Sequence, residues 1–154
     1  MEIDDPRLVQ AHKKMIERIE KYNERMLTVI KNHLAVEQSL NELLAAASRR
    51  WKRRTFTGKI DVGKSLLLQE LHDHVWPVLE AGNDLRNAVA HGDKYGKVEE
   101  RLVDLRKAYL GVASPQQRKG IEEMNEVQLV TSAFSHCGSF LVVAADRLAE
   151  EKKH

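Results

Sequence analysis

The sequence predicts an all-α protein, built as one bundle of about four to six helices. Leu, Ala, Glu, Lys, Arg and Gln dominate the composition, and these residues favour helices. Aromatic residues make up only 5% of the chain, which argues against an all-β domain. Apolar residues recur mostly three or four positions apart, as they do on one face of a helix. The 154 residues correspond to a single domain, residues 1–154.

The first helix is expected over residues 6–48. Asp5 and Pro6 predict its start, because aspartate can cap a helix and proline is favoured in the first turn. An unbroken helix of this length would be about 65 Å long. A compact domain of this size is only about 40 Å across. The helix therefore either breaks near Asn32 and His33 or projects from the domain to meet a partner.

A loop and two helices are expected next. Residues 49–58 are interpreted as the loop, and Asp61 as the cap of a second helix that reaches about residue 72. Pro77 begins a third helix that reaches about residue 91. Gly92 then ends it, since glycine is typical of the position after a helix.

The remaining helices are expected after a turn at residues 93–96. Apolar spacing predicts a helix over residues 97–110. Ser114 and Pro115 then repeat the cap-and-proline signal of a helix start. A last helix is expected over residues 121–150.

The cysteine content and the apolar stretches predict a cytoplasmic protein. A single cysteine, Cys137, excludes an internal disulfide and a cysteine-rich zinc site, and it suits a reducing compartment. The first ten residues contain no apolar signal region. Residues 127–145 lack charged side chains and are long enough to cross a membrane. Since they include Gln, Thr, Ser, His and Gly, we expect a buried bundle helix and no membrane partner.

Basic residues gather in the middle of the chain. The formal net charge is only +2, but residues 49–64 carry +6, which leaves −4 on the remainder. Such a strip is typical of proteins that bind polyanions, and an aromatic residue within it could stack on an unpaired base. The alternative is a solvated helix end, where cations are favoured. The candidate RNA-binding residues are Arg49, Arg50, Trp51, Lys52, Arg53 and Arg54.

Residues 58–65 match the phosphate-binding pattern G-x-x-x-x-G-K-[ST]. A true P-loop follows a buried parallel strand, and the basic and polar residues 51–57 cannot form one. The chain also lacks the alternating strand–helix pattern that would supply a sheet. We therefore expect two glycines near a loop, followed by a helix cap. Nucleotide binding, which would depend on Lys64, is the less favoured interpretation.

A second motif consists of Arg86, Asn87, His91 and Gly92 at the end of the predicted third helix. Only this arginine–histidine pair has Asn after the arginine and Gly after the histidine, and only this pair lies in a mid-chain helix. The pattern, in an all-α domain, resembles the HEPN superfamily. Many HEPN proteins are metal-independent endoribonucleases that act as homodimers, often as toxins or in phage defence, and others are inert scaffolds or regulators. The arginine–histidine pairs with four to six intervening residues are Arg7 and His12, Arg86 and His91, and Arg147 and His154.

The residue types of this motif suit RNA cleavage by internal transesterification. The reaction needs a base for the 2′-OH proton and a cation for the charge on the phosphorus oxygens. His91 is the expected base, because histidine titrates near neutrality, and Arg86 is the expected phosphate-binding cation. Asn87 shares a helix face with His91 and would orient it.

The two main catalytic candidates, Arg86 and His91, do not lie on the same face of an ideal helix. Arg86 and His91 are five positions apart, about 140° around an ideal helix. The resemblance implies a site shared across the two-fold axis of a homodimer, and we expect the third and last helices to form that interface. The expected partners are thus RNA, a second copy of the chain and an antitoxin or regulatory protein.

A structural role is the alternative for the same motif. His91 would then bind the last carbonyl groups of its helix, and Arg86 would pair with Asp84 or Glu80. The protein would then be a helical interaction or regulatory module that binds a partner and catalyses no reaction.

The other histidines predict no metal site and no cofactor. His72 and His74 flank Asp73, but residues two apart on a helix point in different directions. His33, with Glu37 four positions later, is interpreted as a surface or packing residue.

Overall fold

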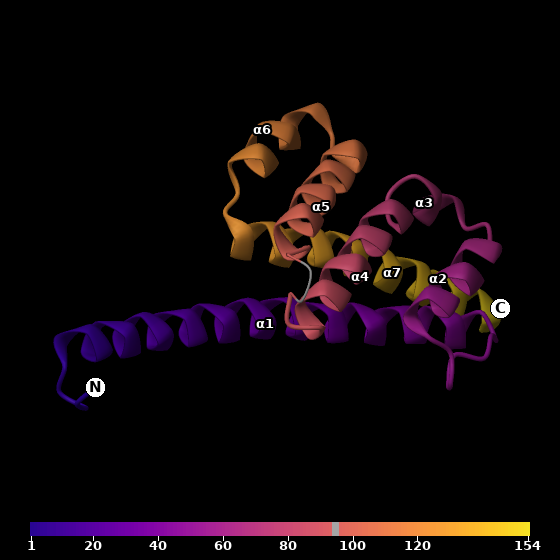
Figure 1. Cartoon of the computed structure of the whole chain (residues 1–154). Helices are drawn as coiled ribbons and strands as arrows, with labels where there is room; N and C mark the ends of the chain where they lie inside the picture. The colour runs from indigo at the N-terminus through magenta and orange to yellow at the C-terminus, as the bar shows by residue number, and fades with distance from the viewer. Residues whose placement is uncertain (94–95) are drawn as a thin grey trace.

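The structure is a computed structural model that describes residues 1–93 and 96–154. These residues form seven helices and no strand (Figure 1). The predicted all-α class is confirmed, whereas the expected four to six helices are too few. The helices are α1 (Pro6–Ala46), α2 (Phe56–Ser65), α3 (Gln69–His72), α4 (Trp76–Ala90), α5 (Val98–Val112), α6 (Pro115–Glu123) and α7 (Glu126–Lys152).

The core lies between the C-terminal half of α1, the length of α7, and α4. Helices α1 and α7 run side by side in the same direction (Figure 1). Polar contacts join them at both ends of α7: Arg25, in the middle of α1, pairs with Glu126 at 2.7 Å, and the Lys152 ammonium donates at 2.7 Å to the hydroxyl of Ser48, just after α1. Helix α4 packs against both, and α5 covers its other side. The fully buried leucines of this core include Leu40, Leu43, Leu44, Leu79, Leu85, Leu129 and Leu141.

Helix α1 is a single unbroken helix. The Asp5 carboxylate accepts from the Arg7 backbone N–H at 2.8 Å, which confirms the predicted start. At 1.5 Å per residue, its 41 residues span about 60 Å. The expected break near Asn32 and His33 does not occur. Residues 6–24, which we call the arm, are exposed, and the arm projects beyond the bundle from its root, where the Tyr22 hydroxyl donates to the Val89 backbone carbonyl at 3.4 Å (Figure 1).

The segment that matches the phosphate-binding pattern is helical. The Thr55 hydroxyl, rather than Asp61, caps α2 by accepting from the Gly58 backbone N–H at 3.0 Å. Both Gly58 and Gly63 therefore lie inside a helix that ends at Ser65, well before residue 72. Since no loop follows a strand here, this segment lacks the geometry of a P-loop.

The helix that carries the Arg86–His91 motif ends as predicted. Helix α4 stops at Ala90, and Gly92 adopts the left-handed conformation (φ 70°) that favours glycine. The helix expected over residues 97–110 corresponds to α5. The expected turn at residues 93–96 includes residues 94–95, which lie outside the described residues.

The last part of the chain forms two helices instead of the one expected over residues 121–150. Ser114 and Pro115 do start a helix, α6, as predicted. Asn125 then begins α7 with a capping box: its side chain accepts from the Gln128 backbone N–H at 2.9 Å, and the Gln128 side chain accepts from the Asn125 backbone N–H at 3.0 Å. This reciprocal pair stabilises a new helix start and explains the separation.

Helix α7 is long and apolar enough to cross a membrane by length and composition alone. Core helices of soluble proteins pass the same test. The apolar side of α7, including Phe134, Cys137 and Leu141, is buried in the bundle. Its packing is therefore that of a core helix in a soluble-like fold.

Candidate functional site

The Arg86–His91 motif lies at the C-terminal end of α4. Arg86 and Asn87 are half-buried, and His91 is exposed at the residue that caps the helix. Arg86 Nη1 donates to Asn87 Oδ1 at 3.3 Å. Glu80 pairs with Lys64 instead, and within residues 1–93 and 96–154 no carboxylate pairs with Arg86. The expected alternative, an ion pair of Arg86 with Asp84 or Glu80, is therefore wrong for this structure.

The motif borders two separate hollows. Arg86 lines a hollow of about 290 Å³, which we call the polar hollow. His91 lines a neighbouring hollow of about 200 Å³, and Asn87 borders both. The chain thus brings Arg86 and Asn87 together but does not place Arg86 and His91 in one hollow. The hollow beside His91 is also lined by Asp84, Asp93, Lys97 and Arg101.

The polar hollow is built from three elements that are distant in sequence. Helix α1 supplies one wall, the start of α2 the second and the last turns of α4 the third. Its polar lining residues include His33, Glu37, Thr55, Thr57, Asn83 and Arg86.

A hydrogen-bonded chain crosses the floor of the polar hollow. His33 Nε2 lies 3.2 Å from Asn83 Oδ1, and since that oxygen only accepts, Nε2 carries the proton. Asn83 Nδ2 donates in turn to the Thr57 hydroxyl at 3.5 Å. Burial lowers the pKa of His33, and the nearby Arg86 and Lys59 cations lower it further, against opposing effects of Asn83 and Glu37. The His33 ring is therefore neutral at physiological pH.

Lys59 joins the polar hollow to residues 49–54, which we call the basic loop. The buried Lys59 ammonium lies 3.5 Å from the Glu37 carboxylate, which gives this buried charge the partner it needs. The same ammonium lies 5.6 Å from the centre of the Trp51 ring, within cation–π range. Lys59 thus contacts both a wall of the hollow and the loop that precedes α2.

The basic loop presents its charges to solvent, as the predicted strip requires. Arg49, Arg50, Lys52, Arg53 and Arg54 are exposed, and Trp51 is half-buried. A second ammonium, from Lys52, lies 5.8 Å from the Trp51 ring. Because two lysines cover this ring, base stacking on it would require one of them to move.

The buried polar residues of this site were not predicted from the sequence. In the part of the chain that the structure describes, three polar or charged residues are buried: His33 (4% exposed), Lys59 (6%) and Asn83 (8%). All three lie in or beside the polar hollow. The signal in the sequence was a polar residue at an apolar position of an amphipathic helix, because such a residue is costly unless it has partners or a function.

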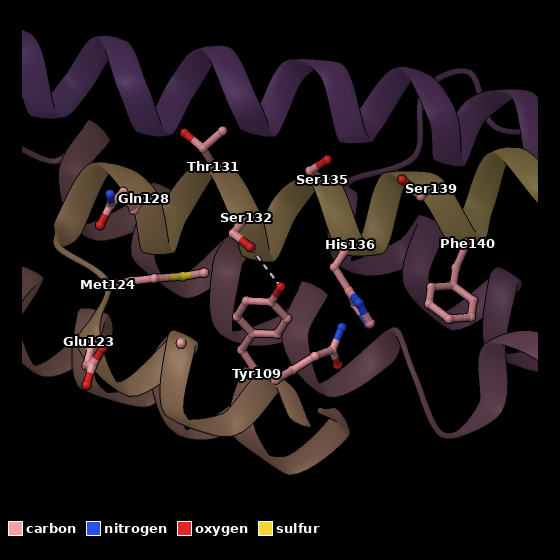
Figure 2. Close-up of a pocket in the computed structure, with 12 residues that line it drawn as sticks. Tyr109, Glu123, Met124, Gln128, Thr131, Ser132, Ser135, His136, Ser139 and Phe140 are labelled. Carbon is pink, nitrogen blue, oxygen red and sulfur yellow. Dashed lines mark hydrogen bonds between the residues drawn. The ribbon is translucent and has the colours of Figure 1, made fainter. Parts of the chain in front are cut away.

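The largest hollow lies elsewhere, among α5, α6 and α7, with a volume of about 840 Å³ (Figure 2). The Tyr109 and Ser132 hydroxyls lie 2.8 Å apart, and His136 Nε2 lies 2.8 Å from the His74 backbone carbonyl. Burial lowers the pKa of His136. Each of these three side chains already has a hydrogen-bond partner within the protein, and the lining residues include no arginine or lysine, so this hollow is poorly suited to a phosphate.

The remaining reactive residues form no further centre. No group of three His, Cys, Asp or Glu side chains within the described ranges is placed to hold a metal ion. In the His72–Asp73–His74 sequence, His74 stacks on Phe140 with ring centres 5.0 Å apart. Cys137 is buried, and burial raises the pKa of its thiol.

Comparisons with known proteins give no match to a protein family, a curated protein or a solved structure.

Proposed function

We propose that this chain is a metal-independent endoribonuclease of the HEPN type. Its proposed biological role is that of a toxin or a phage-defence component. The observation that supports this proposal best is the environment of Arg86. Its guanidinium lines a hollow, has Asn87 beside it and pairs with no carboxylate among the described residues. An arginine without an internal acid is available for an external phosphate, which it can bind through paired donors.

The proposed reaction is an internal transesterification. His91 takes the proton of a ribose 2′-OH, whose oxygen then bonds to the adjacent phosphorus while the bond from phosphorus to the 5′ oxygen breaks. Arg86 stabilises the charge that builds on the non-bridging oxygens, and Asn87 orients the reacting groups. The leaving 5′ oxygen takes a proton from water and His91 returns its proton to the solvent, so the products are a 2′,3′-cyclic phosphate and a 5′-hydroxyl.

A homodimer is part of the proposal because the two main residues line different hollows of one subunit. A second copy that packs through α4 and α7 would bring its own His91 to the Arg86 of the first. The exposed side of α7 offers small and apolar side chains for such contact. These are Thr131, Ser135, Ser139, Val142 and Val143.

Cleavage of a mixed RNA pool in excess EDTA tests the proposal. Wild-type protein is expected to cut RNA and leave cyclic-phosphate ends, whereas His91→Ala and Arg86→Ala each lose about 100-fold or more. His12→Ala is the matched control, since His12 has the same spacing from Arg7 and lies exposed on the arm. Each variant is first checked for folding by circular dichroism. Intact RNA with the folded wild type, or equal cutting by the variants, would overturn the proposal.

The second candidate function is a non-catalytic helical interaction module, and the arm favours it. Several apolar residues on the arm are exposed, as a helix that meets a protein partner requires. Such a partner would be an antitoxin or a regulatory protein that contributes a helix. In that case the chain cleaves no RNA, and His91→Ala has no catalytic activity to reduce. Substitution of the exposed apolar stripe on the arm abolishes binding of the partner protein. The stripe consists of Leu8, Met15, Ile19 and Tyr22.

A further inference from the structure

We propose that the polar hollow is a phosphate-binding site completed within one subunit, and that Thr57 is one of its ligand-binding residues. The identity of the ligand as RNA, with the scissile phosphate in the hollow, rests on the proposed function. The hollow itself, with Arg86 on one wall and Thr57 on another, belongs to a single subunit.

The charges around the hollow favour an anion. The Glu37 carboxylate is neutralised by the buried Lys59 ammonium, 3.5 Å away. His33 is held neutral by its surroundings, as its lowered pKa indicates. The lining itself carries one negative charge, on Glu37, and one positive charge, on Arg86, and the Lys59 ammonium beside the lining brings the sum to +1.

Donor groups converge on the hollow from two further sides. The Thr57 hydroxyl accepts from Asn83 Nδ2, which leaves its own proton free to donate to an anion. Asn87 Oδ1 accepts from Arg86, which leaves the Asn87 amide hydrogens for the same ligand. The first turn of α2 also borders the hollow, and N–H groups of a first helical turn lack acceptors within the helix.

The hydrogen-bonded chain from the buried His33 and Asn83 to the exposed Thr57 has a positioning role. Each link fixes the next side chain, so the Thr57 hydroxyl is oriented before a ligand arrives. A buried histidine and a buried asparagine are costly in a core, and orientation of a binding group gives them a function.

The basic loop supplies a path by which a polyanion can reach the hollow. Lys59 contacts Glu37 at the hollow and Trp51 in the loop. The exposed basic side chains of the basic loop therefore lie next to a wall of the hollow. A strand held by this loop can place one phosphate beside Arg86.

The test is binding of a fluorescent 2′-O-methyl RNA 12-mer, measured by anisotropy on the full chain. This RNA lacks the attacking hydroxyl and cannot be cleaved, so binding is measured apart from turnover. Thr57→Val is nearly isosteric but removes the hydroxyl that accepts from Asn83, so its folding is first checked by circular dichroism and urea unfolding. It should bind about tenfold more weakly, and Thr57→Ser, which keeps the hydroxyl, should bind like the wild type.

Two further variants measure the charge contribution. Arg86→Ala should weaken binding by about tenfold or more and reduce the slope of log affinity against log salt by about 0.7. Lys119→Ala, which removes an equal charge from the exposed face of α6, should leave affinity within about twofold of the wild type.

The outcomes separate this inference from the proposed ribonuclease activity. If Thr57→Val weakens binding while Thr57→Ser does not, the phosphate site is supported, even in a chain that cleaves no RNA. If Thr57→Val and Arg86→Ala bind like the wild type, or if the wild type binds no RNA, the phosphate site is wrong. In the first of these negative cases Arg86 can still stabilise the transition state of cleavage without contributing to binding of the uncleaved RNA, so the two proposals fail independently.

Discussion

At the scale of single residues, His33 is the histidine whose surroundings are most constrained. It is buried between Phe56, whose ring centre lies 4.3 Å away, and Asn83, with Arg86 near enough to depress its pKa. The folded protein therefore holds this ring neutral over a range of pH in which an unfolded histidine binds a proton.

The His33 environment predicts how stability changes with pH. The unfolded histidine has a pKa of about 6.5. Below that pH the unfolded state binds a proton that folded His33 does not, so the free energy of unfolding falls as the pH falls, until the lowered pKa of the folded state is reached. Urea unfolding at pH 7.5 and 5.5 should show a smaller decrease in His33→Gln than in the wild type.

The control for this experiment is His12→Gln on the exposed arm. It should show the wild-type decrease between the two pH values. His136, whose pKa burial also lowers, contributes in the same direction, so His33→Gln removes only part of the effect. An unchanged decrease in His33→Gln would contradict the assigned role of His33.

Residue patterns predicted one half of the candidate site and missed the other. Arg86 and Asn87 are neighbours in sequence, so a local motif was enough to find them. The contact of His33 with Asn83 joins positions 50 residues apart and exists only because α1 packs beside α4. No local pattern contains that information.

At the scale of single elements, α2 shows why a motif needs its structural context. Gly63, the second glycine of the phosphate-binding pattern, faces the Trp76 ring of α4 instead of a phosphate. A Cβ atom built on Gly63 would lie 2.4 Å from Trp76 Cη2. Glycine is therefore required here for close packing of α2 on α4.

The surroundings of two helical glycines predict that alanine substitutions there change the free energy of unfolding in opposite directions. Gly63→Ala should destabilise the protein by about 1–3 kcal/mol, because the Trp76 ring has to move. Gly120→Ala in α6 should stabilise it by about 0.5–1 kcal/mol, because no atom lies within 4 Å and alanine favours helices. Urea unfolding measures both, and a stabilised Gly63→Ala would show that the packing of α2 on α4 is misassigned.

Helix ends were predictable where proline marks them and less so where a side chain alone does. Pro6 and Pro115 correctly predicted the starts of α1 and α6. The caps of α2 and α7, Thr55 and Asn125, were missed because capping is decided by backbone geometry that many threonines and asparagines never adopt.

At the scale of the whole molecule, the dominant feature is the arm of α1 (Figure 1). The mismatch between helix length and domain size predicted either a break or a projection. The helix projects because, after Pro6, α1 contains no proline or glycine that would end or weaken it. The exposed apolar stripe on the arm follows from the same continuity.

The arrangement of the two hollows leads to the central claim, that Arg86 of one subunit and His91 of another act on the same RNA phosphate. In a dimer of this kind each subunit contributes one residue to each of two sites. A dimer of one Arg86→Ala subunit and one His91→Ala subunit would then keep one intact site. If both residues acted within one subunit, no mixed dimer could be active.

The most direct measurement is therefore RNA cleavage in EDTA by the two variants, alone and after mixed refolding. Each variant alone should be inactive, and the mixture should recover roughly a quarter of the wild-type rate, since about half of the dimers are mixed and one of their two sites is intact. Recovery of that size would support a ribonuclease site shared between subunits. A mixture as inactive as its components, beside an active wild type, would contradict the shared site, and an inactive wild type would contradict the ribonuclease itself.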